Sequence, residues 1–204
     1  MARTAGSTAA VTRQRILDAA SALFAERGYA GTSMRDIAQH LRMTSASLYY
    51  HFPAKEELLS ALVGPVMDGL DHFADQAEGA GLDQEELVRG IIAVLEDSGR
   101  TLQAIATEPT ALRILVDRHD LGRRLARLEQ LIADPDDPAM LLRCRCALGA
   151  IRVGIMSTHA RRQQSATAAP KPGPPRLSGT ERELLVSIAL AVLNAPMPSG
   201  PRTG

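Results

Sequence analysis

The sequence predicts an all-α protein, and two observations support this fold class. Apolar residues recur along most of the chain at the three- and four-residue spacings that place them on one face of a helix. Nowhere do β-branched and polar residues alternate between turn signals, as they would in a half-buried strand. With 204 residues, of which 45% are hydrophobic and 23% charged, the chain has the composition of a globular protein that buries a core.

The first quarter of the chain predicts three helices and the start of a fourth. Residues 1–7 are small and polar and are expected to form a flexible tail. Gly28 is a fitting end for the first helix. Ser33, with Asp36 three residues later, is close to a capping box, and Thr44 is a good N-cap for the third helix. The four predicted helices span residues 8–27, 33–41, 45–51 and 55–78.

The remaining three quarters are also predicted to be helical. Pro109 ends one helix, because a residue that precedes proline disfavours the helical conformation. A proline-rich stretch at about 165–179 is expected to be a mobile loop, and residues 195–204 a flexible tail. The predicted helices span residues 83–107, 110–118, 121–133, 139–163 and 180–193.

The formal net charge is zero, but the charge is distributed unevenly. Residues 1–55 carry +4, residues 56–140 carry −11 and residues 141–204 carry +7. A basic segment set apart from an acidic one indicates a polyanion as the partner of the basic segment. The alternative is random variation on solvated faces.

Several functional classes lack support in the sequence. The chain shows no Ser/His/Asp grouping, glycine-rich phosphate loop or His-x-x-x-His spacing, so no catalytic residue, metal site or cofactor is expected. Cys144 and Cys146 would lie about 200° apart on a helix. They are expected to be small apolar filler, with a redox role as the alternative. No basic leader precedes an apolar stretch and no apolar run is long enough for a bilayer, so we expect a cytoplasmic protein without membrane contact.

Two short helices joined by a short turn and preceded by a longer helix are typical of helix-turn-helix DNA-binding domains. The second short helix, TSASLYYH, begins with small and hydroxylic residues that let a helix approach base edges closely. No acid occurs between Asp36 and Glu56, as expected of a surface that faces phosphates. The tyrosine pair alone would fit the edge of a core equally well. The combination favours DNA binding.

Two sequence blocks resemble the DNA-binding domain of the tetracycline-repressor (TetR) family. They are TSMRDIA at 32–38 and SLYYHFPAKEELL at 47–59, and a helix ending in Phe24-x-x-x-Gly28-Tyr29 precedes them. The resemblance covers about residues 11–62. It implies a three-helix DNA-binding domain with a helix-turn-helix at 8–54. A long fourth helix would join it to a larger helical effector-binding and dimerisation domain within 55–194.

The resemblance also implies roles for individual residues of the second and third helices. Arg35 would reach a guanine edge or a phosphate, and Leu48 and Phe52 would belong to the core. Base edges would face Ser45, Ala46 and Ser47. The expected phosphate contacts are Thr44, Tyr49, Tyr50, His51 and Lys55, with Ser33 and Arg42 as further candidates.

The scarcity of lysine supports a phosphate contact by Lys55 independently of the resemblance, because the chain has only two lysines against 21 arginines. Replacing Lys55 by alanine is expected to lower the salt dependence of DNA binding by about one unit.

Two positions depart from the family pattern. Arg42 stands where the family most often has glycine, and a left-handed residue there would cost about 1 kcal/mol. Ser45 stands where a longer basic side chain is common, which predicts more dependence on DNA shape.

The last two helices carry most of the apolar surface. They predict either an ordinary monomer core or a four-helix dimer interface built from two helices of each subunit. A homodimer would also read a two-fold-symmetric operator. The expected interface residues are Gly149, Ala150, Val153, Gly154, Leu184, Leu185, Ile188, Ala191 and Val192.

The middle of the chain is expected to hold a small-molecule effector. Aromatic residues that would hold a flat cation are scarce there, which favours an aliphatic or amphipathic ligand. The expected pocket residues are Leu62, Val66, Met67, Leu70, Phe73, Leu95, Leu102, Ile105, Leu112 and Leu115.

Taken together, the sequence predicts a transcriptional repressor that an effector releases from a palindromic operator. The effector would shift the population of dimers toward a spacing that no longer fits DNA, with the fourth helix as lever. Two alternatives remain open. One is a ligand-independent DNA-binding regulator or architectural protein whose acidic body binds another protein, and the other is a small helical enzyme.

Overall fold

The computed structural model describes residues 3–96, 108–165 and 176–196, and the described residues form helices without any strand. The predicted all-α class is therefore confirmed for this part of the chain. The helices are α1 (Arg3–Arg27), α2 (Met34–His40), α3 (Ser45–His51), α4 (Lys55–Ala77), α5 (Gln84–Glu96), α7 (Pro109–His119), α8 (Leu121–Ile132), α9 (Pro138–Ser165) and α10 (Gly179–Leu193).

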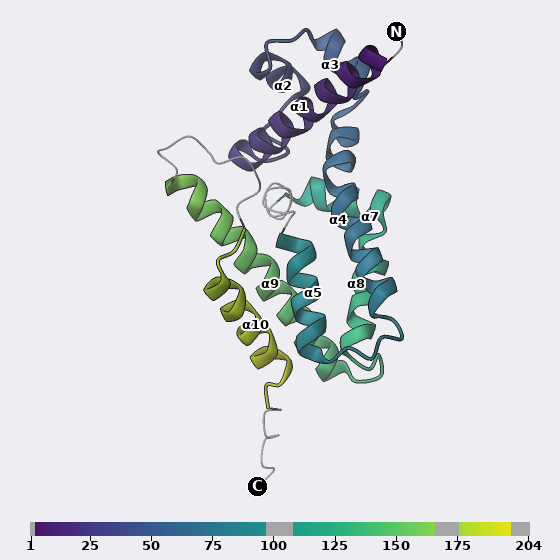
Figure 1. Ribbon diagram of the computed structural model, residues 1–204, viewed down its shortest axis with the longest axis vertical. Coiled ribbons are helices and arrows are strands. Elements are labelled where there is room, and N and C mark those ends of the chain that lie inside the picture. The colour runs from purple at the N-terminus through teal and green to yellow at the C-terminus, as the bar shows by residue number, and fades with distance from the viewer. Residues whose placement is uncertain (1–2, 97–107, 166–175, 197–204) are drawn as a thin grey trace.

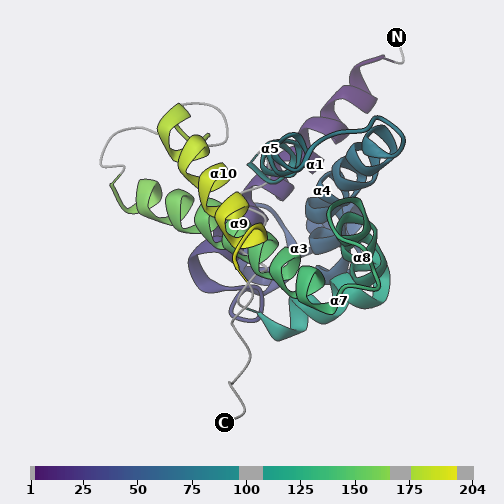
Figure 2. The ribbon, with the colours of Figure 1, turned by 90° about the horizontal axis from the view of Figure 1, so that it is seen from below.

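The helices form a small unit at one end of the molecule and a larger body (Figure 1). Helices α1, α2 and α3 make the small unit, and α4 runs from it into the body. Figure 2 shows the body from below. Helices α9 and α10 lie on one side of α5, and helices α4, α7 and α8 lie on its other side. The packing agrees with this view, because α5 contacts α4, α8, α9 and α10.

Three clusters of buried apolar side chains hold these layers together. The first fills the space between α1, α2, α3, the start of α4 and α7. The second joins α5, α9 and α10, and the third joins α4, α5 and α8. Helices α4 and α5 each contribute to two clusters and so bury residues in more than one direction, as expected of helices inside a bundle.

Most predicted helix ends lie within two residues of the observed ones, and one prediction is wrong. Helix α1 begins at Arg3, so residues 3–7 are not a tail. This stretch has no proline, and extending an existing helix costs little once a nucleus has formed. The end of the predicted loop lies close to the expected boundary, since residues 176–178 are not helical and α10 begins at Gly179. Leu177, in this last part, is buried in the second cluster. Three predicted segments lie outside the described residues: the helix residues 97–107, the loop residues 166–175 and the tail beyond residue 196.

A buried carboxylate fixes the start of α10 against the end of α5. Glu96 is only 3% exposed. Its two oxygens accept hydrogen bonds from the backbone N–H of Leu177 at 2.5 Å and from the Arg182 guanidinium at 2.7 Å. Ser178 then caps α10 in a capping box with Glu181. Glu96 thus satisfies a buried amide and pairs with a cation in the first turn of α10.

No helix in the described part of the chain is long and apolar enough to cross a lipid bilayer.

Replacing Glu96 by alanine is expected to lower the free energy of unfolding by about 1–3 kcal/mol, because the buried Leu177 amide loses its acceptor. Urea unfolding would measure this loss. Glu183 provides a matched control, since it also joins α5 to α10 through an ion pair with Arg89 but is solvent-exposed. Its replacement by alanine is expected to cost under about 1 kcal/mol. Equal losses for the two variants would contradict the role of Glu96.

Candidate nucleic-acid interface and ligand cavity

The second and third helices are positioned by local hydrogen bonds. The Ser33 Oγ accepts from the Asp36 amide at 3.2 Å, and the Asp36 carboxylate accepts from the Ser33 amide at 2.8 Å. The Ser33 hydroxyl also donates to the Asp36 carboxylate, and this hydrogen bond, together with that from the Ser33 amide, holds the pKa of Asp36 below its ordinary value. The Thr44 Oγ1 accepts from the Ser47 amide at 3.2 Å and caps α3. Both predicted caps are therefore present.

The turn between α2 and α3 contains the left-handed residue that the sequence suggested. Arg42 has a φ of 54°, a conformation that costs a non-glycine residue about 1 kcal/mol. The turn closes through hydrogen bonds from the Arg42 amide to Gln39 and from the Met43 amide to Ala38. The side chain of Arg42 is exposed.

Helix α3 buries one face and exposes the other. Leu48 and Phe52 are buried in the first apolar cluster, as predicted. Tyr49 is half-exposed and Tyr50 is 83% exposed, so the tyrosine pair does not belong to the core. The remaining expected DNA contacts of the two helices are also at the surface: Ser33, Arg35, Thr44, Ser45, Ala46 and Ser47 are exposed, and His51 is half-buried.

Arg13 of α1 holds the end of α3 in place, a role that the sequence did not indicate. Its guanidinium donates to the carbonyl of His51 at 3.2 Å and lies over the Phe52 ring, 4.0 Å from the ring centre. The two residues are 38 positions away along the chain, so only the packing of α1 against α3 brings them together.

Lys55, an expected phosphate contact, has hydrogen-bond partners within the protein. Its ammonium donates to the backbone carbonyls of Tyr29 at 2.8 Å and Thr32 at 2.9 Å, and it lies 4.1 Å from the centre of the Tyr29 ring. Burial holds the pKa of Lys55 below its ordinary value. The lysine therefore joins the start of α4 to the segment between α1 and α2, and its donors are directed into the protein.

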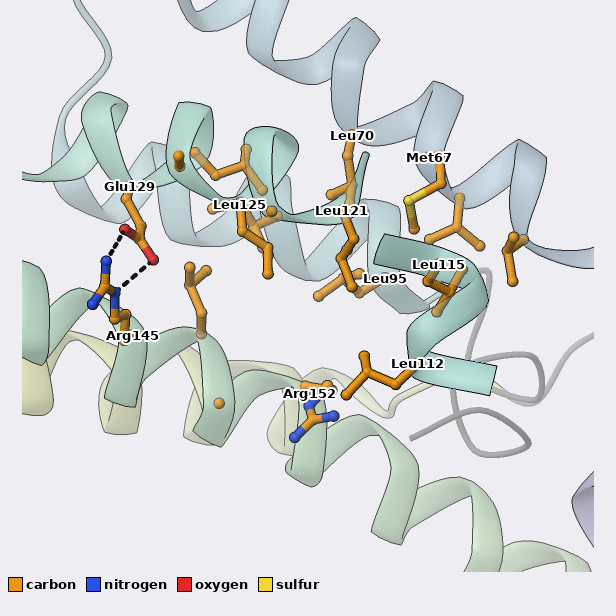
Figure 3. A pocket seen from close by; sticks show the side chains of 18 residues that line it. Met67, Leu70, Leu95, Leu112, Leu115, Leu121, Leu125, Glu129, Arg145 and Arg152 are labelled. Carbon is orange, nitrogen blue, oxygen red and sulfur yellow. Dashed lines mark hydrogen bonds and ion pairs between the residues drawn. The ribbon is translucent and has the colours of Figure 1, made fainter. Parts of the chain in front are cut away.

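The body contains a cavity of about 580 Å³ between α4, α5, α7, α8 and α9 (Figure 3). This volume lies in the range of small-molecule sites. Six of the expected pocket residues line it: Val66, Met67, Leu70, Leu95, Leu112 and Leu115. That the cavity binds an effector stays a prediction.

Two expected pocket residues lie elsewhere, and two lie outside the described residues. Leu62 packs against the first apolar cluster. Phe73 packs against Gly90, where an added Cβ would come within 2.0 Å of its ring. Leu102 and Ile105 fall within the undescribed stretch 97–107. The lining also includes Leu121, Leu125 and Leu128, whose spacing of four and three along α8 was the available signal.

Three charged side chains line the otherwise apolar cavity. Glu129 of α8 and Arg145 of α9 form a bidentate ion pair with N···O distances of 2.9 and 3.0 Å. Arg152, also on α9, lies near Leu112, away from that pair (Figure 3). The cavity therefore has a neutralised pair at one end and a single guanidinium toward the other.

Helix α7 belongs to the cavity and to the small unit at the same time. Leu112 and Leu115 line the cavity, while Ala111 and Leu115 are buried in the cluster that holds α1, α2 and α3. An ion pair of 2.8 Å between Arg118 and Glu57 also joins α7 to α4. The small unit and the cavity wall therefore share a helix.

The expected dimer residues divide into three groups. Gly154 packs within the subunit against the buried Leu185, since an added Cβ would lie 2.3 Å from that side chain, and the place of both residues in a dimer interface stays a prediction. Gly149 lines the cavity. Val153, Leu184, Ile188 and Ala191 are exposed on α9 and α10, with Ala150 and Val192 half-buried.

Leu142 of α9 adds a further exposed apolar side chain that the sequence reasoning missed. The two cysteines of α9 point in different directions, as predicted from their spacing. Cys144 is buried among α5, α9 and α10, and burial raises the pKa of its thiol to about 11. This agrees with a role as apolar filler. Cys146 is exposed.

A capped pair of short helices, with an exposed second helix that starts in small hydroxylic residues, defines a helix-turn-helix protein of the kind that reads DNA. Comparison with known proteins specifies the family. Residues 16–62 match the family of bacterial regulatory proteins named tetR. The match is to the N-terminal segment that holds α2, α3 and the start of α4.

Relatives and solved structures support this assignment. The chain is 31% identical to the transcriptional repressor KstR2 of Rhodococcus jostii over 105 residues, which are 52% of this chain and 48% of that protein. It is 37% identical to the regulator TtgR of Pseudomonas putida over 78 residues, 38% of this chain and 37% of TtgR. The chain thus matches about half the length of KstR2 and less of TtgR.

The fold extends the likeness beyond the matched segment. The solved structure of the probable transcriptional regulatory protein RHA5900 has a TM-score of 0.63 and 25% identity, over 90% of this chain and 100% of that one. A transcriptional regulator from Aquifex aeolicus has the same TM-score at 19% identity, over 89% of this chain and 99% of that one. The helical body is therefore also built as in regulators of this kind.

Replacing Lys55 by methionine is expected to lower the free energy of unfolding by about 1–3 kcal/mol, because two backbone carbonyls lose a charged donor. The salt dependence of DNA binding should change by much less than one unit, since the ammonium already has two partners within the protein. Thermal unfolding and DNA titration at several salt concentrations would measure both.

Replacing the exposed Arg35 by alanine is the matched control. It is expected to leave stability unchanged and to lower the salt dependence by about one unit. A Lys55 variant that keeps its stability but loses one unit of salt dependence would return Lys55 to the phosphate contacts.

Proposed function

We propose that the protein is a transcriptional repressor that binds a two-fold-symmetric operator as a homodimer and leaves it when a small molecule occupies the cavity. The single observation that carries this proposal is the exposed face of α3, set in a capped helix-turn-helix of the TetR family. An exposed apolar face supports dimerisation, and the cavity supports ligand binding. The helices α4 and α7, which the cavity shares with the DNA-binding unit, support a link between ligand and DNA.

DNA recognition is supported by the chemistry of the α3 surface. Ser45, Ala46 and Ser47 are short enough to let the helix approach base edges, and their hydroxyl and methyl groups suit direct contacts with bases. Around them, Arg35, Tyr49 and Tyr50 are exposed and can reach phosphates. Because these side chains are mostly short, we expect DNA shape to contribute to specificity.

Dimerisation is supported by an apolar face that the subunit leaves uncovered. On α9, Leu142 and Val153 are 63% and 55% exposed, and on α10, Leu184 and Ile188 are 59% and 40% exposed. Positions 184, 188 and 191 recur at helical spacing, so they share one face of α10. Two copies of such a helix pair would form a four-helix interface and carry two recognition helices to one operator.

Coupling is supported by α7 as well as by the long helix α4. A ligand in the cavity would touch Leu112 and Leu115 on α7 and Val66 and Met67 on α4, and both helices bury residues in the core of the DNA-binding unit. A ligand that prefers one arrangement of these helices shifts the population toward it. The cavity favours this proposal over a ligand-independent regulator whose acidic body binds another protein.

Selection of bound DNA from a random pool by the purified protein tests the proposed function. We expect a palindromic sequence whose half-sites are separated by about one or more turns of DNA. Replacing Ser47 by glutamate should abolish binding, because it sets an acid against the phosphates, whereas glutamate at the exposed Val116 of α7 should not. Enrichment of no sequence, or equal binding by the Ser47 variant, would contradict the proposal.

Replacing both Leu184 and Ile188 by glutamate is expected to convert the dimer to a monomer, because charges would be buried in the apolar interface. Analytical ultracentrifugation would measure the mass, and operator affinity should fall with the loss of the dimer. The Val116→Glu variant again serves as the control and should stay dimeric. A double variant that remains a dimer would place the interface elsewhere.

A further inference from the structure

The cavity carries a charge imbalance that indicates the class of its ligand. Its described lining is mostly aliphatic, with Glu129, Arg145 and Arg152 as the charged members. Glu129 is 8% exposed, and its two oxygens are both occupied by Arg145. This pair has no need of a ligand. The remaining charge of the lining is the guanidinium of Arg152.

Arg152 has no hydrogen-bond or ion-pair partner among the residues that the structure describes. Two arginines of the neighbouring helix α8 differ from it, because Arg124 pairs with Asp71 and Arg127 pairs with Asp75 and Glu78. The carboxylate of Glu129, the acid in the cavity lining, already belongs to Arg145. Arg152 is also solvent-exposed, so its guanidinium lies where the cavity meets solvent. A ligand whose head group meets it there either supplies the counter-charge or displaces water from an unpaired cation.

The position of Arg152 defines how such a ligand would lie. Arg145 and Arg152 are seven residues apart on one face of α9, which separates their backbones by about 10 Å. Leu148 and Gly149 of α9 lie between them, with Leu121 and Leu125 of α8 also in the lining. Figure 3 shows Leu121 and Leu125 between the Glu129–Arg145 pair and the Arg152 end of the cavity. A polar head at Arg152 therefore leaves an apolar chain among leucines.

The sign of the head group follows from the cost of desolvation. A neutral or cationic ligand would remove water from the guanidinium without providing an acceptor of opposite charge, which is unfavourable. A carboxylate accepts two parallel hydrogen bonds from the guanidinium fork, and such charge-assisted bonds are about twice as strong as neutral ones. The same aliphatic cavity thus discriminates between ligands of equal chain length by their charge.

We infer that the cavity binds an aliphatic carboxylate whose head group is held by Arg152 and whose chain lies between α4, α7, α8 and α9. This inference rests on the proposed function only in naming that ligand as the effector; the binding itself can be measured without DNA. Because Arg152 lies near Leu112, the bound head group would sit beside the helix that reaches into the DNA-binding unit.

Isothermal titration and thermal shift of the full chain with dodecanoate, dodecan-1-ol and dodecylamine, each below its micelle concentration, test the inference. Dodecanoate is expected to bind at least tenfold more tightly than the alcohol and to stabilise the folded state, since a ligand specific for the native protein raises its melting temperature. The amine should bind most weakly. Equal binding of the carboxylate and the alcohol, or no binding of any of them, would overturn the inference.

Variants separate the head-group contact from general apolar binding. Replacing Arg152 by glutamine should weaken dodecanoate at least tenfold and leave dodecan-1-ol unchanged, while Arg152→Lys should keep part of the preference for the carboxylate. Arg143→Gln is the matched control, because Arg143 lies on the same helix but does not line the cavity. An Arg152→Gln protein that melts normally and still binds dodecanoate at full strength would also overturn the inference.

A tryptophan at Leu125 tests the position of the chain. It is expected to fill part of the cavity and to weaken dodecanoate and dodecan-1-ol alike, in contrast to the head-group variant. Unchanged binding of both would place the chain outside the cavity and would contradict the inference.

Release of the operator is measured in a separate experiment, so that effector release and the ligand class can be contradicted independently. Binding of dodecanoate through Arg152 without release of selected DNA would leave the ligand class standing and contradict effector release. Binding of the selected operator by a protein that ignores carboxylates would leave the repressor proposal standing and contradict the ligand class.

Discussion

The rest of the structure depends on the apolar core that the DNA-binding unit shares with the body. The helices α1, α2 and α3 cannot bury enough surface by themselves, because small domains bury a smaller fraction of their surface and are only marginally stable. The core is completed by Leu58, Leu59 and Val63 of α4 and by Ala111 and Leu115 of α7. The orientation of α3 is therefore tied to two helices that also form walls of the cavity. A change in the packing of either helix must be accommodated by the unit that carries the recognition surface, because packed cores do not deform continuously.

The charge distribution has a structural consequence in the body as well as a functional one. Three acids of residues 56–140 pair with arginines of α8: Arg124 pairs with Asp71 of α4, and Arg127 pairs with Asp75 and Glu78. Each such exposed pair contributes little to stability, under about 1 kcal/mol. Together they align α4 with α8, so the two helices present their leucines to the same cavity. In the DNA-binding unit, by contrast, Arg35 and Arg42 stay at the surface, while Lys55 is turned inward.

Helices α9 and α10 illustrate how one apolar sequence serves several surfaces. Cys144, Ile151 and Ile155 of α9 are buried against α5 and α10 within the subunit. Leu148 and Gly149 face the cavity, and Leu142 and Val153 are exposed. A helix that is apolar around most of its circumference must find cover on several sides. The exposed apolar face is the part of these helices that the single subunit leaves uncovered.

The sequence by itself determined the features that depend on neighbours along the chain. These include most helix ends, the caps at Ser33 and Thr44, the left-handed Arg42 and the burial of Leu48 and Phe52, because capping, turn geometry and helical period act over a few residues. Only the tertiary structure decided that Lys55 meets two carbonyls and that Leu185 fills the space beside Gly154. It also decided that Glu129 pairs with Arg145, while Arg152 has no partner within the described ranges. Helical period shows which residues share a face, whereas the atoms that cover that face come from distant segments that meet only when the bundle packs.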